Sequence, residues 1–227
     1  PPTGDAVVSE PTVDRRRGGD QVIPRPKLSL PGRPAPWSDV PHPKRRIELP
    51  TLRETLAMMG PPRRSPLEGA GVRGSAVLLP IYETDDGGLN IVLTRRSARM
   101  RSHSGEVSFP GGGQDPGETF FETAVREAYE EIDLTDPVEV VGELDHLQTV
   151  TSRSFIVPIV GLLPRRPTLT PNPDEVDYVI DVPVAEFLLD EVYREERWGL
   201  PPLDRPLYFF ELYGDTVWGA TAYMLRN

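Results

Sequence analysis

Three glutamates lie with an arginine within six consecutive residues of the chain, and the carboxylates of the glutamates could bind a cation. They are Arg126, Glu127, Glu130 and Glu131, and they follow a glycine-rich turn. Like charges at helical spacing repel one another unless a positive group compensates them. Carboxylate oxygens are the ligands that hard divalent cations prefer. The cluster therefore predicts a site for Mg²⁺ or Mn²⁺.

The segment that follows Thr119 is predicted to be the helix that carries this cluster. Thr119 and Glu122 have the spacing of a capping box, in which each residue satisfies an unpaired backbone group of the first turn. The helix also has an apolar stripe, which is predicted to face the core. The stripe consists of Phe121, Ala124, Val125, Ala128 and Ile132.

The acidic residues occupy one flank of that stripe. At 100° per residue, Glu127 and Glu131 project about 40° apart and one turn from each other, so they can share a cation. Glu130 lies on the same acidic side, where it could join a second metal or hold a bound water. Arg126 falls on the other side of the helix from Glu131 and is predicted to brace a carboxylate or a loop. An acidic face that is merely solvated is the alternative, but the spacing, the capping box and the glycine-rich turn together favour a site.

Strands and a few helices surround the acidic helix. Strands are predicted over residues 72–82, 89–94, 106–109, 139–149, 155–163, 176–182 and 207–213. Further helices are predicted over residues 51–59, over residues 184–189 and from about residue 220 onward. Interspersed strands and helices indicate a layered α/β fold rather than a helical bundle.

The first 47 residues differ in composition from the rest. They hold ten of the 27 prolines, two basic clusters and few apolar residues. Such a composition favours extended or disordered conformations. Residues 1–47 are therefore predicted to be a flexible leader or an arm that docks on a partner chain, and residues 48–227 a single folded domain.

Composition excludes several classes of function. A net charge of −10 argues against a general nucleic-acid binder. The absence of cysteine excludes disulfides, thiolate metal sites and cysteine nucleophiles. The longest apolar run is too short to span a bilayer, and no signal peptide is visible, so we expect no membrane partner and a cytoplasmic location. The three histidines carry no motif of nucleophilic catalysis.

The acidic helix and the turn before it resemble the Nudix box, the signature of hydrolases that cleave nucleoside diphosphates linked to another moiety. The matching positions are Gly112, Glu118, Arg126, Glu127, Ala128, Glu130, Glu131 and Leu134. Only Asp133 departs, because the family has glycine there. That glycine ends the helix, and Asp is among the few other residues that tolerate a left-handed backbone. We therefore expect a small loss of stability and no loss of chemistry.

A second motif lies just upstream and is similar to the one that marks the coenzyme A pyrophosphatase branch of the family. It runs from Leu93-Thr94-Arg95-Arg96-Ser97 through Arg101 and Gly105 to Phe109-Pro110-Gly111-Gly112. The resemblance implies the Nudix α/β/α sandwich, with a mixed sheet between helices. It also implies metal-dependent hydrolysis of coenzyme A or acyl-CoA to 3′,5′-ADP and 4′-phosphopantetheine.

Roles for the box residues come with the resemblance. Glu127 and Glu131 would be metal ligands, and the Gly111 carbonyl would be a further one. Glu130 would support a second metal or the water, and Arg126 would orient the glutamates by ion pairing. Glu130 and Glu131 are both candidates for the general base.

Residues outside the box complete the expected site. Glu175 is a third candidate for the base, since a loop glutamate often reaches the metal site in this superfamily; an exposed loop acid is the alternative. Arg95, Arg96, Arg99 and Arg101 form a basic cluster in an otherwise acidic chain. Arginine suits charge-assisted contacts with phosphate, so Arg96 and Arg101, with Arg95 beside them, are predicted to bind the substrate. Pairing with nearby acids is the alternative.

Two other functions remain open at the level of sequence. The same box would serve hydrolysis of ADP-ribose, NADH or a nucleoside triphosphate. A non-catalytic Nudix module for ligand sensing is the second alternative, although it would not need three intact glutamates. The partner expected in each case is a small nucleoside-diphosphate compound, and a homodimer is the assembly that the family suggests.

Overall fold

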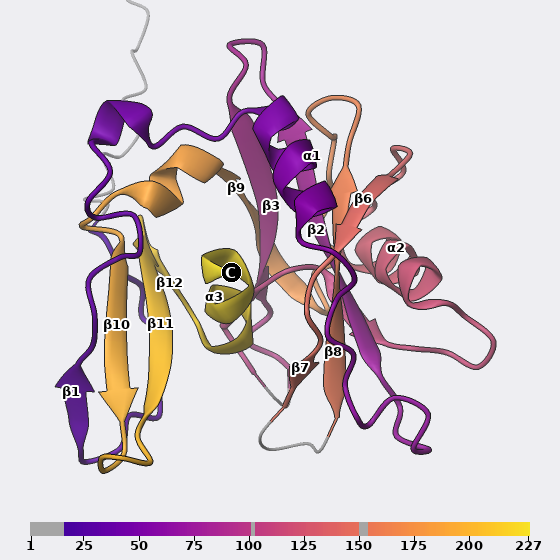
Figure 1. The fold of residues 1–227 in the computed structure, drawn as a ribbon. Coiled ribbons are helices and arrows are strands. Elements are labelled where there is room, and N and C mark those ends of the chain that lie inside the picture. Colours follow the sequence, from indigo (N-terminus) through magenta and orange to yellow (C-terminus); the bar gives the residue numbers. More distant parts are fainter. Residues whose placement is uncertain (1–15, 101–102, 150–153) are drawn as a thin grey trace, which may run out of the picture.

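A mixed sheet forms the centre of the computed structural model, which describes residues 16–100, 103–149 and 154–227 (Figure 1). Its strands are β2 (Ser75–Glu83), β3 (Leu89–Arg96), β4 (Val107–Ser108), β5 (Gly111–Gly113), β6 (Glu139–Glu143), β7 (Leu147–Gln148), β8 (Phe155–Leu162) and β9 (Val176–Pro183). The main order is β4-β3-β2-β8-β6, and β5, β7 and β9 pair with β2, β8 and β3. Strands β2 and β8 are parallel, whereas the other pairs are antiparallel.

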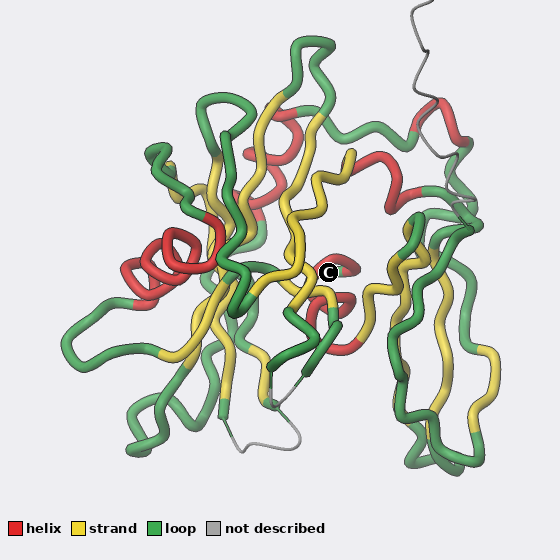
Figure 2. Tube along the Cα trace, turned by 180° about the vertical axis from the view of Figure 1, so that it is seen from behind, coloured by secondary structure: helices red, strands yellow, loops and turns green. Residues whose placement is uncertain are grey.

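Helix α2 (Phe120–Ile132) covers one face of this sheet. Alternate side chains of a strand point to opposite faces, and on β2 the buried Ala76, Leu78 and Tyr82 join the cluster around α2. The apolar stripe of the helix contributes Ala124 and its neighbours one turn apart to the same cluster. A loop leads from the sheet into the helix, as Figure 2 shows from behind.

A second sheet and two helices lie over the opposite face (Figure 1). The sheet is antiparallel, in the order β1 (Ser29–Pro31), β10 (Tyr193–Trp198), β11 (Arg205–Leu212) and β12 (Asp215–Trp218). Helix α3 (Gly219–Arg226) lies between the two sheets, and α1 (Leu49–Met58) lies near β6. Short 3-10 helices complete the described elements, η1 (His42–Lys44) and η2 (Val184–Leu188). The expected layered α/β architecture is confirmed, with this second sheet as an addition.

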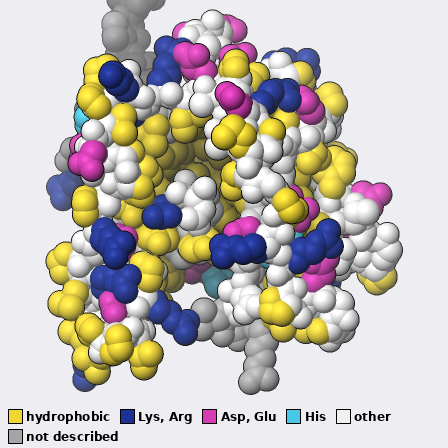
Figure 3. All heavy atoms as spheres, in the orientation of Figure 1, with side chains coloured by type: hydrophobic (Ala, Val, Ile, Leu, Met, Phe, Trp, Pro, Cys, Tyr) yellow, Lys and Arg dark blue, Asp and Glu magenta, His cyan; other side chains and the backbone are white. Residues whose placement is uncertain are grey.

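Helix α1 is the least buried of the α-helices in the described residues. None of its residues is fully buried, and both Met58, its last residue, and the adjacent Met59 are exposed. Figure 3, in the orientation of Figure 1, shows hydrophobic side chains in a hollow on the face turned towards the viewer.

In the part of the chain that the structure describes, no helix combines the length and the apolar character that a membrane crossing requires.

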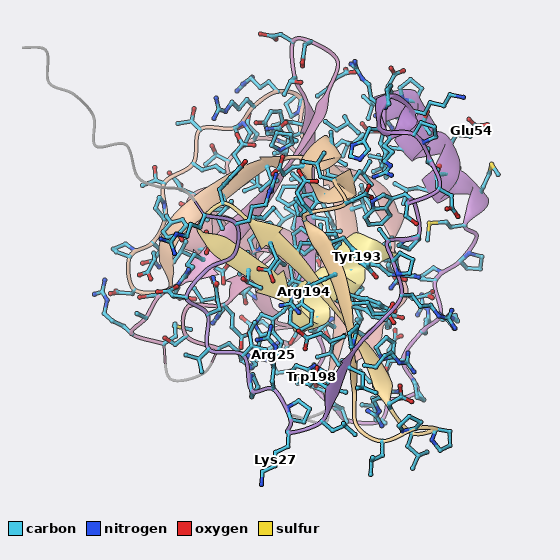
Figure 4. The ribbon with its side chains drawn as sticks, turned by 90° about the vertical axis from the view of Figure 1, so that its left-hand side faces the viewer. Arg25, Lys27, Glu54, Tyr193, Arg194 and Trp198 are labelled. Atoms are coloured by element: carbon cyan, nitrogen blue, oxygen red, sulfur yellow. The ribbon has the colours of Figure 1, made fainter. Side chains whose placement is uncertain are left out.

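The described part of the proline-rich segment lies against the second sheet. Strand β1 pairs with β10, and Arg17 forms a β-bridge with Tyr213. Arg25 and Arg194 lie over the ring of Phe209 on the face of this sheet turned away from α3 (Figure 4). Residues 1–15 lie outside the described residues. The division of the chain after residue 47 stays a prediction.

Several predicted elements differ in detail from the structure. The strand predicted over 139–149 is two strands, β6 and β7, and the helix predicted over 184–189 is the 3-10 helix η2. Strands β1, β5, β10 and β12 are absent from the prediction. Phe121 was predicted to face the core but is 36% exposed. It lies in the first turn of α2, where the neighbouring Phe120 makes the ring contact with Phe155.

Candidate active site

The acidic helix begins and ends as its sequence predicts. Thr119 Oγ1 accepts a hydrogen bond from the Glu122 N–H at 3.2 Å, and Glu122 Oε2 accepts one from the Thr119 N–H at 2.7 Å. This is the complete capping box. At the other end Asp133 has φ 54° and ψ 40°, which is the left-handed conformation expected for the position. The caps fix the direction of the helix, and therefore of its carboxylates.

The glycines of strand β5 let the helix and the sheet approach each other closely. A methyl group on Gly112 would come within 2.5 Å of the Glu127 carboxylate. A methyl group on Gly111 would collide with the backbone of β2, at Ala76 and Val77. A side chain on Gly112 would therefore displace the Glu127 carboxylate, and one on Gly111 would push β5 away from β2, which explains why both positions are glycine.

Glu131 is the most deeply buried carboxylate of the site, with 2% of its surface exposed. Its Oε2 accepts a hydrogen bond from the Gly111 N–H at 3.3 Å, and its Oε1 lies 3.6 Å from Arg96 Nη1. Burial raises the pKa of Glu131 to about 8, although Arg96 and the Gly111 N–H oppose the change. These contacts compensate the buried charge only in part.

Arg126 connects the other carboxylates of the helix to the preceding loop. Its guanidinium donates to Glu118 at 2.7 Å, to Glu127 at 3.0 Å, to Glu130 at 3.0 Å and to the Gly113 carbonyl at 3.1 Å. The hydrogen bond from Arg126 is the main reason that the pKa of Glu118 falls to about 2. Burial raises the pKa of Glu127, and Arg126 opposes that change. Through these contacts Arg126 holds both the carboxylates and the preceding loop in place.

Glu175 lies in a loop that the structure brings to the end of the acidic helix. The Asn172 N–H donates to the Glu131 carbonyl at 2.8 Å, and the Ser97 N–H donates to the Glu175 carbonyl at 2.8 Å. The negative charge of Glu175 contributes to the raised pKa of both Glu127 and Glu131. Its carboxylate is therefore close enough to act electrostatically on the two predicted metal ligands.

The predicted substrate arginines separate in the structure. Arg96 faces Glu131, whereas Arg95 forms ion pairs with Asp20 at 2.6 Å and Asp215 at 2.7 Å. Arg95 thus does not contact the glutamates of the acidic helix. It pairs with two aspartates elsewhere in the chain, which is the alternative that the sequence left open. Arg101 lies outside the described residues. Sequence reasoning missed Asp20 and Asp215, since nothing in their local sequence marks them as partners of Arg95.

The donor set of the site fits a hard divalent cation. In the ranges described, no group of three or more His, Cys, Asp or Glu residues is already arranged as a metal cluster. Arg126 pairs instead with Glu127 and Glu130, and Arg96 approaches Glu131. All the acidic donors are oxygen atoms, and the incompletely compensated charge of Glu131 favours an additional positive group. The residues present therefore suit Mg²⁺ or Mn²⁺.

Comparison with known proteins identifies the family. The model of the NUDIX domain matches residues 72–203, which is more than half of the chain and includes the whole acidic helix. The chain belongs to the Nudix hydrolase family. Members of this family are enzymes that act on phosphoric anhydrides, and they generally use divalent metal ions such as Mg²⁺ or Mn²⁺.

Relatives of this Nudix chain occur in plants and bacteria. Nudix hydrolase 22, chloroplastic, of Arabidopsis thaliana is 40% identical over 160 residues, which cover 66% of this chain and 52% of that protein. The uncharacterized Nudix hydrolase NudL of Photorhabdus laumondii is 38% identical over 157 residues, which cover 68% and 82%. The chain thus spans about half the length of the plant relative.

Solved structures of low identity share the Nudix description. The crystal structure of a MutT/nudix family protein from Enterococcus faecalis has a TM-score of 0.47 and 12% identity, and it covers 82% of this chain and 69% of that one. The Nudix domain of Shewanella oneidensis NrtR, crystallised with ADP ribose, has a TM-score of 0.43 and 20% identity over 55% of this chain and 80% of that one.

Proposed function

We propose that this Nudix hydrolase cleaves the diphosphate linkage of coenzyme A or acyl-CoA, giving 3′,5′-ADP and the (acyl-)4′-phosphopantetheine. The observation that carries the proposal is the position of Arg96, which belongs to the upstream arginine motif and lies 3.6 Å from Glu131 of the box. The motif that suggests coenzyme A and the helix that suggests hydrolysis therefore meet at one place. Arginine is suited to bind the diphosphate there.

The proposed cation would be held by Glu127, Glu131 and Glu130, with the Gly111 carbonyl as a further ligand. When bound, Mg²⁺ or Mn²⁺ would neutralise charge on the diphosphate and lower the pKa of a bound water. Arg126 holds Glu127 and Glu130 in place through its hydrogen bonds.

The other proposed roles concern substrate and water. Arg96, together with Arg101, would bind the diphosphate or the 3′-phosphate of the substrate. Glu175, Glu130 and Glu131 are the candidates for the base that takes a proton from the attacking water. A cytoplasmic location and a homodimer also remain proposals from the sequence.

Turnover of defined substrates tests the proposal. Purified protein is incubated with coenzyme A, acetyl-CoA, ADP-ribose, NADH and a nucleoside triphosphate, each with Mg²⁺ or Mn²⁺, and the products are identified by mass spectrometry. We expect 3′,5′-ADP from the first two. Faster hydrolysis of ADP-ribose, NADH or the triphosphate would assign the alternative substrate, and no turnover of any compound would favour a sensing module.

A pair of variants links the activity to the site. Glu131→Gln removes one proposed ligand and is expected to abolish turnover. Glu54→Gln makes the same chemical change on the exposed surface of α1 (Figure 4) and is expected to leave turnover unchanged. Full activity of Glu131→Gln would show that the ligand assignment is wrong.

A further inference from the structure

Asp215 is a buried carboxylate that joins three distant parts of the chain. It lies at the start of β12, is 3% exposed, and accepts hydrogen bonds from Arg95 Nη1 at 2.7 Å, the Tyr178 hydroxyl at 2.9 Å and Gln21 Nε2 at 2.8 Å. Strands β3 and β9 and the N-terminal segment therefore meet at this one side chain. Both Asp215 and Gln21 lie outside residues 72–203, which match the Nudix domain.

These contacts hold the guanidinium of Arg95 from two sides. Its Nη1 binds Asp215, and its Nη2 donates to Asp20 at 2.6 Å. The same group lies 6.0 Å from the ring centre of Tyr178. Because a guanidinium is planar and rigid, two carboxylates bound at separate nitrogens leave it little rotational freedom.

The next residue along the strand is Arg96, which faces the proposed active site. Strand β9 pairs with β3 through Tyr178 opposite Arg95 and Val176 opposite Arg96, so the register is irregular between the two arginines. Successive side chains of a strand point to opposite faces. Fixing Arg95 on one face therefore fixes the direction in which Arg96 leaves the other face.

Arg96 depends on this support because its own side chain is weakly held. Its contact with Glu131 is long, at 3.6 Å, and among the described residues its buried Nε has no hydrogen-bond partner. The firm contacts of Arg96 are those of its backbone, which pairs with Glu106 at 2.9 Å and Gly105 at 3.1 Å. The direction of the side chain is thus set by the backbone at the end of β3.

We infer that Asp215, with Asp20 and Gln21, acts as a positioning unit that orients Arg96 through Arg95. The inference rests on the proposed function, because Arg96 is taken to bind the diphosphate. The catalytic domain would then need residues on both sides of the family match to place one of its substrate-binding side chains.

A double-mutant cycle in kcat/KM tests this inference. Asp215→Asn keeps the size of the side chain and weakens its ionic contact with Arg95, and we expect kcat/KM to fall about tenfold, through misplacement of Arg96. In an Arg96→Gln background the same substitution should cause no further fall. Equal falls in both backgrounds would overturn the inference, because they would show that Asp215 does not act through Arg96.

Two further variants complete the kinetic test. Asp20→Asn removes the second partner of Arg95 at a side chain that is 84% exposed, so it decides the question if Asp215→Asn does not fold. We expect a fall of about threefold that also disappears in the Arg96→Gln background. Asp204→Asn is the matched control, since it removes the partner of Arg197 in the same sheet. It should leave kcat/KM unchanged, and a fall as large as that of Asp215→Asn would contradict the inference.

Hydrogen exchange provides a measurement that does not depend on activity. The amides of Arg96 and Gly105 should exchange faster in Asp215→Asn than in Asp204→Asn, because their hydrogen bonds lie next to the released Arg95. Unchanged exchange would overturn the positioning role. If the wild-type protein hydrolyses none of the compounds, the proposed function fails, whereas the exchange result still decides whether Asp215 orders this segment.

Discussion

Replacing Glu131 by Gln is expected to stabilise the fold at alkaline pH, although it removes a carboxylate from the proposed active site. Burial raises the pKa of Glu131 from an ordinary value of 4.5 to about 8. Between these two values the folded protein holds a proton that the unfolded chain releases. The free energy of unfolding therefore falls as the pH rises from about 4.5 to about 8, and it stays low above that range. The amide of the variant does not titrate, so Glu131→Gln escapes this loss.

The size of the effect follows from the same pKa. Each pKa unit corresponds to about 1.4 kcal/mol, so ionising Glu131 in the folded state costs at most about 5 kcal/mol. The amide of the variant can keep the hydrogen bond from Gly111, but its NH₂ group is buried beside Arg96. An unsatisfied buried donor costs about 1–3 kcal/mol. We therefore expect the variant to be more stable than the wild type by at most about 2–4 kcal/mol at pH 9.

Urea unfolding at pH 5 and pH 9, with a chelator present, measures this difference. The wild type should lose stability between the two pH values by more than Glu131→Gln does. Glu130→Gln is the control, because Glu130 is half exposed and its pair with Arg126 contributes only about 0–1 kcal/mol. Excess Mg²⁺ should restore stability to the wild type at pH 9 and not to the variant. An identical pH dependence in the wild type and Glu131→Gln would refute the reasoning.

Three further predictions concern other parts of the structure. Gly112→Ala is expected to lower kcat/KM at least about tenfold with little change in Tm, because its methyl group would displace the Glu127 carboxylate; unchanged kinetics would mean that this position of Glu127 is not needed. Arg45→Met is expected to lower the free energy of unfolding, measured by urea titration, by about 3 kcal/mol. The buried guanidinium donates to three backbone carbonyls that would lose their partner. A loss below about 1 kcal/mol would contradict this account. The pKa of Glu118 is lowered to about 2, chiefly by Arg126, so its stabilising contribution is present above about pH 4.5 and is lost as the pH falls towards 2. Circular dichroism between pH 5 and pH 2 should show a shallower decline of stability in Glu118→Gln, and an unchanged acid transition would rule the contribution out.

Local sequence patterns were sufficient to predict the acidic helix. Its capping box, its left-handed end at Asp133 and the bracing role of Arg126 all depend on residues within a few turns of one another. The same reasoning was wrong for Phe121, because in the first turn of the helix it is the neighbouring Phe120 that packs against Phe155 and the core. The long-range contacts of the site could not be predicted. Arg95 has partners 75 and 120 residues away, at Asp20 and Asp215.

Strand β10 shows why part of the second sheet was not predicted. Its sequence is rich in charge, and the compensating partners come from elsewhere in the chain, as with Arg25 and Glu196. The apolar alternation that reveals a half-buried strand is absent when ion pairs cover the outer face. The segment that supplies part of this cover is itself proline-rich, and its composition predicts no contact with a sheet.

The second sheet also has a consequence for the order in which the protein folds. The hairpin of β2 and β3 joins neighbouring segments, whereas the bridge between Arg17 and Tyr213 joins residues almost 200 positions apart. Loop closure becomes less favourable as the separation grows, so the central hairpin can form early and the junction of the N-terminal segment with β11 and β12 late. During synthesis this junction cannot form until residue 215 has left the ribosome. A nascent chain can therefore contain the finished acidic helix before Asp215, the buried partner of Arg95, is available to it.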